Sequence, residues 1–190
     1  MTTDSDPPPL PQVVWSGKHL EMLVRQNWEY VHRKGICGIV GIIAVTADGK
    51  LVLVEQYRRP SAAMVIELPA GLAGDEGAGD EDLATAARRE LLEETGYEAG
   101  KLAQLFEGLS SAGLSDEKIT FFRATQLKKT GPGGGDANEQ IRVHEVPLSD
   151  LPQWLMRQKQ RGALVDLKVY LALAVGAADL MEKLAAEVCT

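Results

Sequence analysis

Three glutamates, Glu90, Glu93 and Glu94, crowd into the stretch RRELLEETGY, which spans residues 88–97. Apolar residues recur around them at helical spacing and predict a helix over residues 83–95. Positions three and four apart lie on one side of a helix, so these carboxylates repel one another at a cost of about 0.2–0.5 kcal/mol per pair. A divalent cation such as Mg²⁺ relieves that repulsion, because it prefers carboxylate oxygens and often bridges to phosphate. A solvated acidic face is the alternative that the cluster alone leaves open.

The composition restricts the classes of partner. The chain has 190 residues, of which 45% are hydrophobic and 25% charged, a mix typical of one soluble globular domain. Its net charge of −7 argues against a nucleic-acid or anionic-membrane binder, and no apolar run reaches the roughly 18 residues of a membrane span. Cys37 and Cys189 are too few for a disulfide framework and have no zinc spacing, so we expect free thiols in a cytoplasmic protein.

The first part of the chain reads as strands. Residues 1–12 are rich in Pro and Asp and predict a disordered tail. Residues 13–35 alternate loosely between apolar and polar positions and predict two or three short strands. The runs GIVGIIAV and LVLVEQYR, joined by the turn sequence ADGK, then predict a hairpin.

The rest of the chain mixes helices with strands. Gly96 is expected to end the acidic helix, and two further helices are expected at Leu151–Arg161 and Val165–Glu187. The segment KKTGPGGGDANEQ contains four glycines and is expected to be mobile. Strands, a helix, further strands and two helices in this order predict an α+β fold, with a mixed sheet packed between helices.

The acidic helix is part of a longer pattern. The chain gives ELPAG at Glu67–Gly71, then Glu81, seven intervening residues, Arg-Glu-Leu, one residue, Glu-Glu, one residue and Gly-Tyr. This pattern resembles the Nudix box. Gly71 is separated from Glu81 by nine residues where the box has five, and the strict spacing places Asp75 there instead. We interpret the difference as a four-residue insertion in a loop, which loops tolerate because closure entropy grows slowly with length.

The resemblance implies a chemistry. Nudix hydrolases use water and Mg²⁺ or Mn²⁺ to cleave a nucleoside diphosphate linked to another group. By this resemblance Glu90, Glu94 and the carbonyl of Ala70 are expected to bind metal. Glu93 is expected to be a metal ligand or to act directly behind the ligands. Arg89 is expected to orient the glutamates through charge-assisted hydrogen bonds.

The likeness extends over roughly residues 13–180 to the Nudix branch that hydrolyses ADP-ribose and related nucleotide sugars. It implies the α/β/α sandwich of that family, with the hydrolase domain at residues 36–190. It also implies that the strands of residues 13–35 swap across a homodimer, where an aromatic residue stacks on adenine. Trp28 fits that position, and a half-buried strand tryptophan is the alternative.

Further substrate contacts follow from the same resemblance. Arg58 is expected to bind substrate, and Arg59 to share that role or to be solvated. Glu67 is expected to contact the terminal ribose or the partner subunit, and a structural carboxylate is equally compatible. Gly113 lies in a loop that reads SPG in many members of the branch and SAG here, which weakens the choice of ADP-ribose over other nucleotide sugars.

The last catalytic part is expected from a distant loop. In the Nudix family a glutamate from this loop approaches the metals and positions or deprotonates water. Glu139 best matches that glutamate, and Asp136 is a second candidate for the same role. The resemblance implies hydrolysis of ADP-ribose to AMP and ribose 5-phosphate. GDP-mannose or ADP-glucose are alternative substrates, and a catalytically silent nucleotide-sugar sensor is an alternative of another class. The full set of mutually repelling acids argues against the sensor, because binding alone does not need it.

Overall fold

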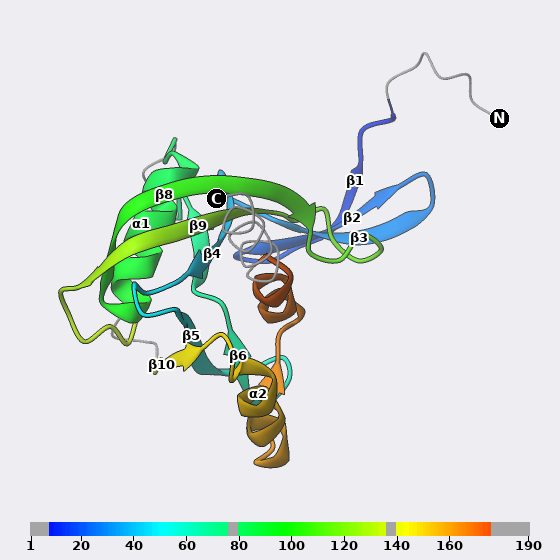
Figure 1. Ribbon diagram of the computed structural model, residues 1–190. Helices are drawn as coiled ribbons and strands as arrows, with labels where there is room; N and C mark the ends of the chain where they lie inside the picture. The colour runs from blue at the N-terminus through cyan, green and yellow to red at the C-terminus, as the bar shows by residue number, and fades with distance from the viewer. Residues whose placement is uncertain (1–7, 76–79, 136–139, 176–190) are drawn as a thin grey trace, which may run out of the picture.

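The computed structural model describes residues 8–75, 80–135 and 140–175. Its named elements, in chain order, are β1 (Gln12–Ser16), β2 (Leu20–Arg25), β3 (Trp28–Arg33), β4 (Gly38–Ala44), β5 (Lys50–Arg58), β6 (Ala63–Glu67), β7 (Ala70–Ala73), α1 (Leu83–Thr95), β8 (Tyr97–Leu109), β9 (Lys118–Lys129), β10 (Arg142–Pro147), α2 (Leu151–Gln160) and β11 (Leu164–Val165) (Figure 1). A further helix covers residues 167–175.

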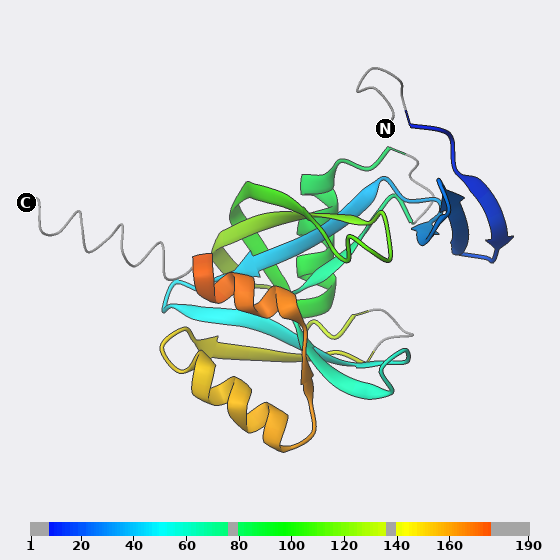
Figure 2. The same cartoon turned by 90° about the vertical axis from the view of Figure 1, so that its right-hand side faces the viewer.

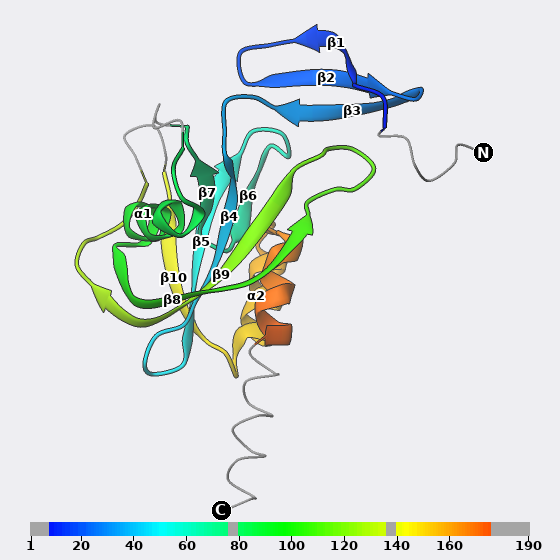
Figure 3. The same ribbon diagram turned by 90° about the horizontal axis from the view of Figure 1, so that it is seen from above.

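The strands form three sheets. One four-stranded sheet has the order β7-β4-β9-β8 and another has the order β10-β5-β6-β11, while β1, β2 and β3 form a sheet of their own. Each four-stranded sheet contains one parallel pair, β4 with β9 and β6 with β11, so the mixed pairing that the sequence predicts is present and is divided over two sheets. Figure 3 shows α1 on one side of these strands and α2 with the 167–175 helix on the other. The predicted α+β arrangement is confirmed.

The predicted hairpin between β4 and β5 is wrong. The turn exists, since Gly49 N donates to Thr46 O at 3.0 Å, but only a single bridge, Val45 with Leu51, joins the two segments. Beyond it β4 pairs with β7 and β9, and β5 pairs with β6 and β10. A continuous apolar run indicates that a strand is buried on both faces. It does not say which strand is its neighbour, and the turn sequence alone was misleading.

Two hydrophobic clusters hold the layers together. The cluster on the α1 side includes Ala87 and Leu91 of the helix packed against Ile42 and Phe122. The cluster on the other side joins both sheets to α2 and to the 167–175 helix, in part through the fully buried Leu151. The site described below lies where the two sheets and these helices meet.

Helix ends agree with their sequence signals at α1 and less well at the last helix. Asp82 caps α1 by accepting from the N–H groups of Ala84 and Thr85, and Gly96 ends it with a left-handed φ of 71°. The last helix does not begin at Val165, as predicted, because that residue pairs in parallel with Ile66 of β6. Asp166 instead starts the helix, in the manner of an N-cap.

The N-terminal sheet stands apart from the body of the molecule (Figure 2). The predicted short strands are present, and the first begins at Gln12, the last residue of the predicted tail. Backbone bonds join the sheet to the β8–β9 loop, with Val31 N donating to Leu114 O at 2.8 Å. Side chains add to this junction, since Arg33 Nε donates to Glu117 Oε1 at 2.8 Å.

Candidate active site

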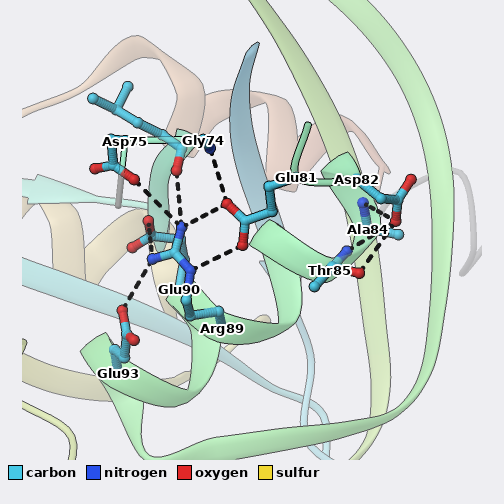
Figure 4. Close-up of polar contacts among 10 residues, drawn as sticks. Gly74, Asp75, Glu81, Asp82, Ala84, Thr85, Arg89, Glu90 and Glu93 are labelled. Carbon is cyan, nitrogen blue, oxygen red and sulfur yellow. Dashed lines mark hydrogen bonds and ion pairs between the residues drawn. The ribbon is translucent and has the colours of Figure 1, made fainter. Parts of the chain in front are cut away.

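Arg89 of α1 is the centre of a dense cluster of carboxylates (Figure 4). Its guanidinium donates to both oxygens of Glu81 at 3.1 Å, to Glu90 Oε1 at 2.9 Å and to Glu93 Oε2 at 3.2 Å. It also donates to the carbonyl of Leu72 at 2.9 Å, which ties α1 to β7. The sequence predicted that Arg89 orients the glutamates, and the hydrogen bonds that this requires are present between these side chains.

The insertion in the preceding loop does not displace Glu81. In addition to its two bonds with Arg89, its Oε2 accepts from Gly74 N at 3.0 Å. Hydrogen bonds from Arg89, and then from the Gly74 N–H, hold the pKa of Glu81 below its ordinary value. Four of the inserted loop's residues, 76–79, lie outside the described residues. The described residues on either side of this gap place Glu81 against Arg89 of α1 and against Gly74.

Glu90 is the acid with the most restricted surroundings. Its side chain is 12% exposed, and burial raises its pKa to about 7 even though Arg89 pulls in the opposite direction. A Cβ added to Gly71 would lie 1.9 Å from the Glu90 carboxyl carbon, so a side chain there would push this carboxylate from its position. A nearby cation would favour the charged form of an acid whose pKa is raised in this way.

Glu94 and Glu93 complete the acidic wall. Glu94 is buried, and its Oε2 accepts from the Ala70 N–H at 3.0 Å. This bond places the two residues side by side although they come from α1 and β7. Glu93 is about half exposed, at 45% of its side chain, and lies next to Arg89.

These carboxylates face a cavity of about 760 Å³ between the two four-stranded sheets. Its lining includes the predicted metal ligands Ala70, Glu90, Glu93 and Glu94, together with Arg89. Arg58 and Glu67, from β5 and β6, line it as well and form a bidentate pair, with bonds of 2.6 and 2.7 Å. Most of the predicted site residues are therefore gathered around one space of a size typical for a small-molecule site.

Three predicted substrate residues lie outside this cavity. Arg59 is exposed in the turn after β5 and is not among the lining residues, which fits its solvated alternative. Trp28 and Gly113 meet each other, because the indole Nε1 donates to the Gly113 carbonyl at 3.1 Å across 85 residues of sequence. Trp28 is 62% exposed, so the half-buried alternative does not hold for it. Both lie on the N-terminal side of the molecule rather than around the carboxylates of their own chain.

The described part of the glycine-rich segment is attached to α1. Gly134 N donates to the carbonyl of Glu94 at 2.9 Å, and Gly135 N donates to that of Glu93 at 3.1 Å. These bonds satisfy carbonyls at the C-terminal end of α1, and the mobility of the segment stays a prediction. Asp136 and Glu139 lie outside the described residues, and their roles stay predictions.

The donor set fits a hard divalent cation. Carboxylate and carbonyl oxygens are the ligands that Mg²⁺ and Mn²⁺ prefer, and the glutamates and Ala70 provide both kinds. Within the ranges that the structure describes, no three acidic, histidine or cysteine side chains are already arranged to hold an ion. The geometry explains this, because Glu90 bonds to Arg89 and Glu94 to Ala70 N. A bound cation would replace part of these contacts.

Comparisons with known proteins decide the family. A model of the NUDIX domain matches residues 37–167. The chain belongs to the Nudix family. It is a Nudix hydrolase, as the pattern around Arg89 predicted.

The chain is similar to proteins with three different curated names. The chain is 36% identical over 137 residues to a methanol dehydrogenase activator of Bacillus methanolicus, covering 72% of this chain and 70% of that protein. It is 39% identical over 114 residues to an ADP-ribose pyrophosphatase of Bacillus subtilis, covering 60% of each. It is 33% identical over 112 residues to a GDP-mannose pyrophosphatase of Pectobacterium atrosepticum, covering 55% of each. The match thus spans less than two thirds of the last two relatives.

A solved structure supports the fold. The crystal structure of an ADP compounds hydrolase superposes with a TM-score of 0.60 at 21% identity, covering 85% of this chain and 99% of that one. None of the helices in the described ranges has the length and hydrophobicity to cross a lipid bilayer.

The sequence missed some lining residues. The ion pair of Arg33 with Glu117 lines the cavity from the N-terminal side. Asp166 and Lys168 line it from the start of the last helix. The pattern Asp-Leu-Lys at a helix start indicates a cap, but no local signal says that a distant cavity lies in front of it.

Proposed function

We propose that this Nudix hydrolase splits the diphosphate link of a nucleoside diphosphate sugar, with ADP-ribose as its preferred substrate and AMP and ribose 5-phosphate as its products. The observation that carries the proposal is the acidic wall of α1, which faces a cavity that also contains the Arg58–Glu67 pair. Such a wall repels a diphosphate unless cations lie between them, and the surplus of acid is what such cations require.

Glu90, Glu94 and the Ala70 carbonyl, with Glu93 beside them, would hold Mg²⁺ or Mn²⁺, which would supply neutralisation of the diphosphate charge and a water of lowered pKa. Arg89 keeps the glutamates in place through the bonds described above. Arg58, fixed by both oxygens of Glu67, lines the cavity with a positive charge that attracts the substrate's diphosphate.

Water attacks one phosphorus, the P–O–P link breaks, and the departing phosphate carries the electron pair of that bond. A carboxylate must accept the proton of the attacking water. Glu139, Asp136 and Glu93 are the three candidates. Glu93 lies within the described residues, lines the cavity and is partly exposed, so it can reach water there.

We further propose that the enzyme works as a homodimer. Trp28 holds an exposed ring, anchored by the carbonyl of Gly113, outside the cavity of its own chain. An aromatic ring in this position is suited to stack on a base in the partner's cavity. Sedimentation at micromolar concentration should give twice the chain mass of 20.5 kDa. A monomer that still binds adenine through Trp28 would remove this part of the proposal.

The choice of substrate rests on the relatives. Two of them are named for ADP-ribose and GDP-mannose, so a guanine nucleotide sugar is the alternative with the same chemistry. The relative named as a methanol dehydrogenase activator favours a second function, in which this chain acts on another enzyme. The intact acidic wall supports hydrolysis as the activity in both cases.

A substrate panel tests the proposal. ADP-ribose, ADP-glucose, GDP-mannose and NAD are incubated with the protein and Mg²⁺, and phosphatase-sensitive products are measured. ADP-ribose should give the highest kcat/KM, and removal of metal with EDTA should abolish turnover. A preference for GDP-mannose would overturn the assignment of ADP-ribose as the substrate. If the protein cleaved none of these compounds, the result would favour a catalytically silent sensor.

A further inference from the structure

A second group of charged side chains, Asp166 and Lys168, lines the cavity from the side opposite to α1. Asp166 and Lys168 begin the 167–175 helix, and both line the same cavity as Glu90. Figure 3 shows that this helix and α1 lie on opposite sides of the strands. A substrate whose diphosphate is held at α1 therefore has this group of side chains beside one of its other parts.

Asp166 holds the lysine in place through both of its carboxylate oxygens. Its Oδ1 accepts the backbone N–H of Lys168 at 2.7 Å, and its Oδ2 accepts the side-chain Nζ of the same residue at 2.5 Å. The two side chains are only 24% and 25% exposed. A lysine tied in this way loses less side-chain freedom on binding a ligand than a free one.

The segment that carries the pair is itself fixed to the sheet. Leu164 and Val165 of β11 pair in parallel with Val65 and Ile66 of β6, and Asp166 N donates to the Ile66 carbonyl at 2.9 Å. The next residue of β6, Glu67, is the partner of Arg58. The Asp166–Lys168 pair therefore stands next to the strand that supplies the other charged pair of the cavity, and it is positioned by backbone hydrogen bonds rather than by a loop.

The chemistry of the pair indicates its ligand. A lysine ammonium has three donors, and one of them is used on Asp166, so two remain. The carboxylate keeps lone pairs that can accept. A phosphate would be attracted by the lysine but repelled by the aspartate that is hydrogen-bonded to it. Neighbouring hydroxyl groups of a sugar both donate and accept, so they match a donor and an acceptor held side by side.

We propose that Asp166 and Lys168 bind the vicinal hydroxyls of the sugar beyond the diphosphate and thereby select nucleotide sugars over simpler nucleoside diphosphate esters. This inference rests on the proposed function, because it assigns the sugar end of that substrate. It adds a specificity site on the layer opposite the catalytic carboxylates, built from residues outside the Nudix motif.

The test compares ADP-ribose with the methyl ester of ADP, which has the same diphosphate charge and no terminal sugar. Lys168→Met removes the ammonium and keeps the length of the chain. It should lower kcat/KM for ADP-ribose about 10- to 100-fold, because the hydrogen bond between the charged ammonium and the terminal sugar is lost. It should leave kcat/KM for the methyl ester within about 2-fold, because that compound has no terminal sugar to make this bond. Lys168→Arg should restore part of the preference.

Two controls make the outcome unambiguous. Lys101→Met changes an exposed lysine of β8 and should alter neither substrate. Thermal melting should give the same midpoint for both variants and the wild type. An equal loss on both substrates, or no loss on ADP-ribose, would overturn the sugar contact.

Failure of the proposed function has a different signature. If the wild type turned over neither compound, hydrolysis of nucleotide sugars would be refuted, but calorimetric affinities would still test the pair. Wild type that binds ADP-ribose no more tightly than the methyl ester refutes the inference. A preference for ADP-ribose that Lys168→Met abolishes supports it.

Discussion

Two buried clusters of charge in this molecule are balanced in opposite ways. Glu55, fully buried on β5, is one acid beside two cations and a histidine: Arg161 Nη2 lies at 2.6 Å, Arg142 Nη1 at 3.6 Å and His144 Nε2 at 2.8 Å. At the cavity, Arg89 is one cation bonded to Glu81, Glu90 and Glu93, with Asp75 Oδ1 at 3.6 Å. The first cluster has an excess of positive partners and the second an excess of negative charge.

The pKa values follow the balance. Burial opposes the ionisation of Glu55, but hydrogen bonds from His144 and Arg161 outweigh it and lower its pKa. Burial raises the pKa of Glu90 to about 7, and Arg89 does not outweigh it. A carboxylate compensated by the protein stabilises the fold, whereas one left uncompensated is ready for an external cation. The comparison therefore predicts that Glu55 is a structural acid and that the acids at the cavity are functional, and mutations can test it.

The largest effect is expected when the negative excess is reduced. Glu94→Gln should lower kcat more than about 100-fold, since it removes a proposed metal ligand, while changes merely behind such ligands already cost 10- to 100-fold. The free energy of unfolding should stay the same or rise, because the glutamine oxygen can still accept from Ala70 N and one repelling charge is gone. Steady-state kinetics with Mg²⁺ and urea denaturation measure the two quantities.

Glu98→Gln provides the matched control for this change. Glu98 is an exposed glutamate of β8, so its loss should affect neither kinetics nor stability. Near-normal turnover of Glu94→Gln would refute the metal-ligand assignment. A large loss of stability would instead mean that the acidic wall is structural.

The opposite pattern is expected at Glu55. Glu55→Gln leaves His144 and Arg161 without their buried anion and should lower the free energy of unfolding by about 3 kcal/mol, the lower end for a broken buried pair. Turnover should change less than about 3-fold at a temperature where the variant is folded. Urea denaturation at neutral pH measures the first effect.

The same comparison has a pH dependence of known sign. The pKa of Glu55 is lower in the folded than in the unfolded chain, so the folded state binds fewer protons. Its contribution is complete above the ordinary glutamate pKa of 4.5 and is lost as pH falls toward the folded value. The stability difference between wild type and Glu55→Gln should therefore shrink below that pH. A difference independent of pH would show that packing, not charge, is responsible.

The sequence predicted the acidic cluster well because it is local. Arg89 and its glutamates lie within one helix, whose start at Leu83 and end at Thr95 follow from periodicity and from Gly96. Spacing along one helix fixes which side chains are neighbours. Even the inserted loop did not disturb this, since Glu81 needs only to reach the first turns of the same helix.

Contacts between distant segments were beyond the sequence. Glu55 and Arg161 are 106 residues apart, and nothing near either one marks the other as its partner. The wrong hairpin has the same cause, because local turn chemistry does not report which sheet a buried strand joins. Arg59 was named beside Arg58 for its place in the chain, yet only Arg58 lines the cavity. Pairing across sequence is decided by packing, which a single sequence does not display.

The smallest effect tests a case between the two clusters. Glu67 is nearly buried and is paired with Arg58, so it is balanced like Glu55, yet it lines the cavity like Glu90. Glu67→Gln removes the charge that fixes the guanidinium and should raise KM for ADP-ribose about 5- to 10-fold with kcat nearly unchanged, because the chemistry at α1 is untouched. Steady-state kinetics and urea denaturation of the same preparation measure the kinetic constants and the free energy of unfolding. If the free energy of unfolding fell by as much as in Glu55→Gln while KM stayed constant, charge balance alone would identify a structural acid. A change in KM without a loss of stability would show that a position at the cavity also decides whether an acid is structural or functional.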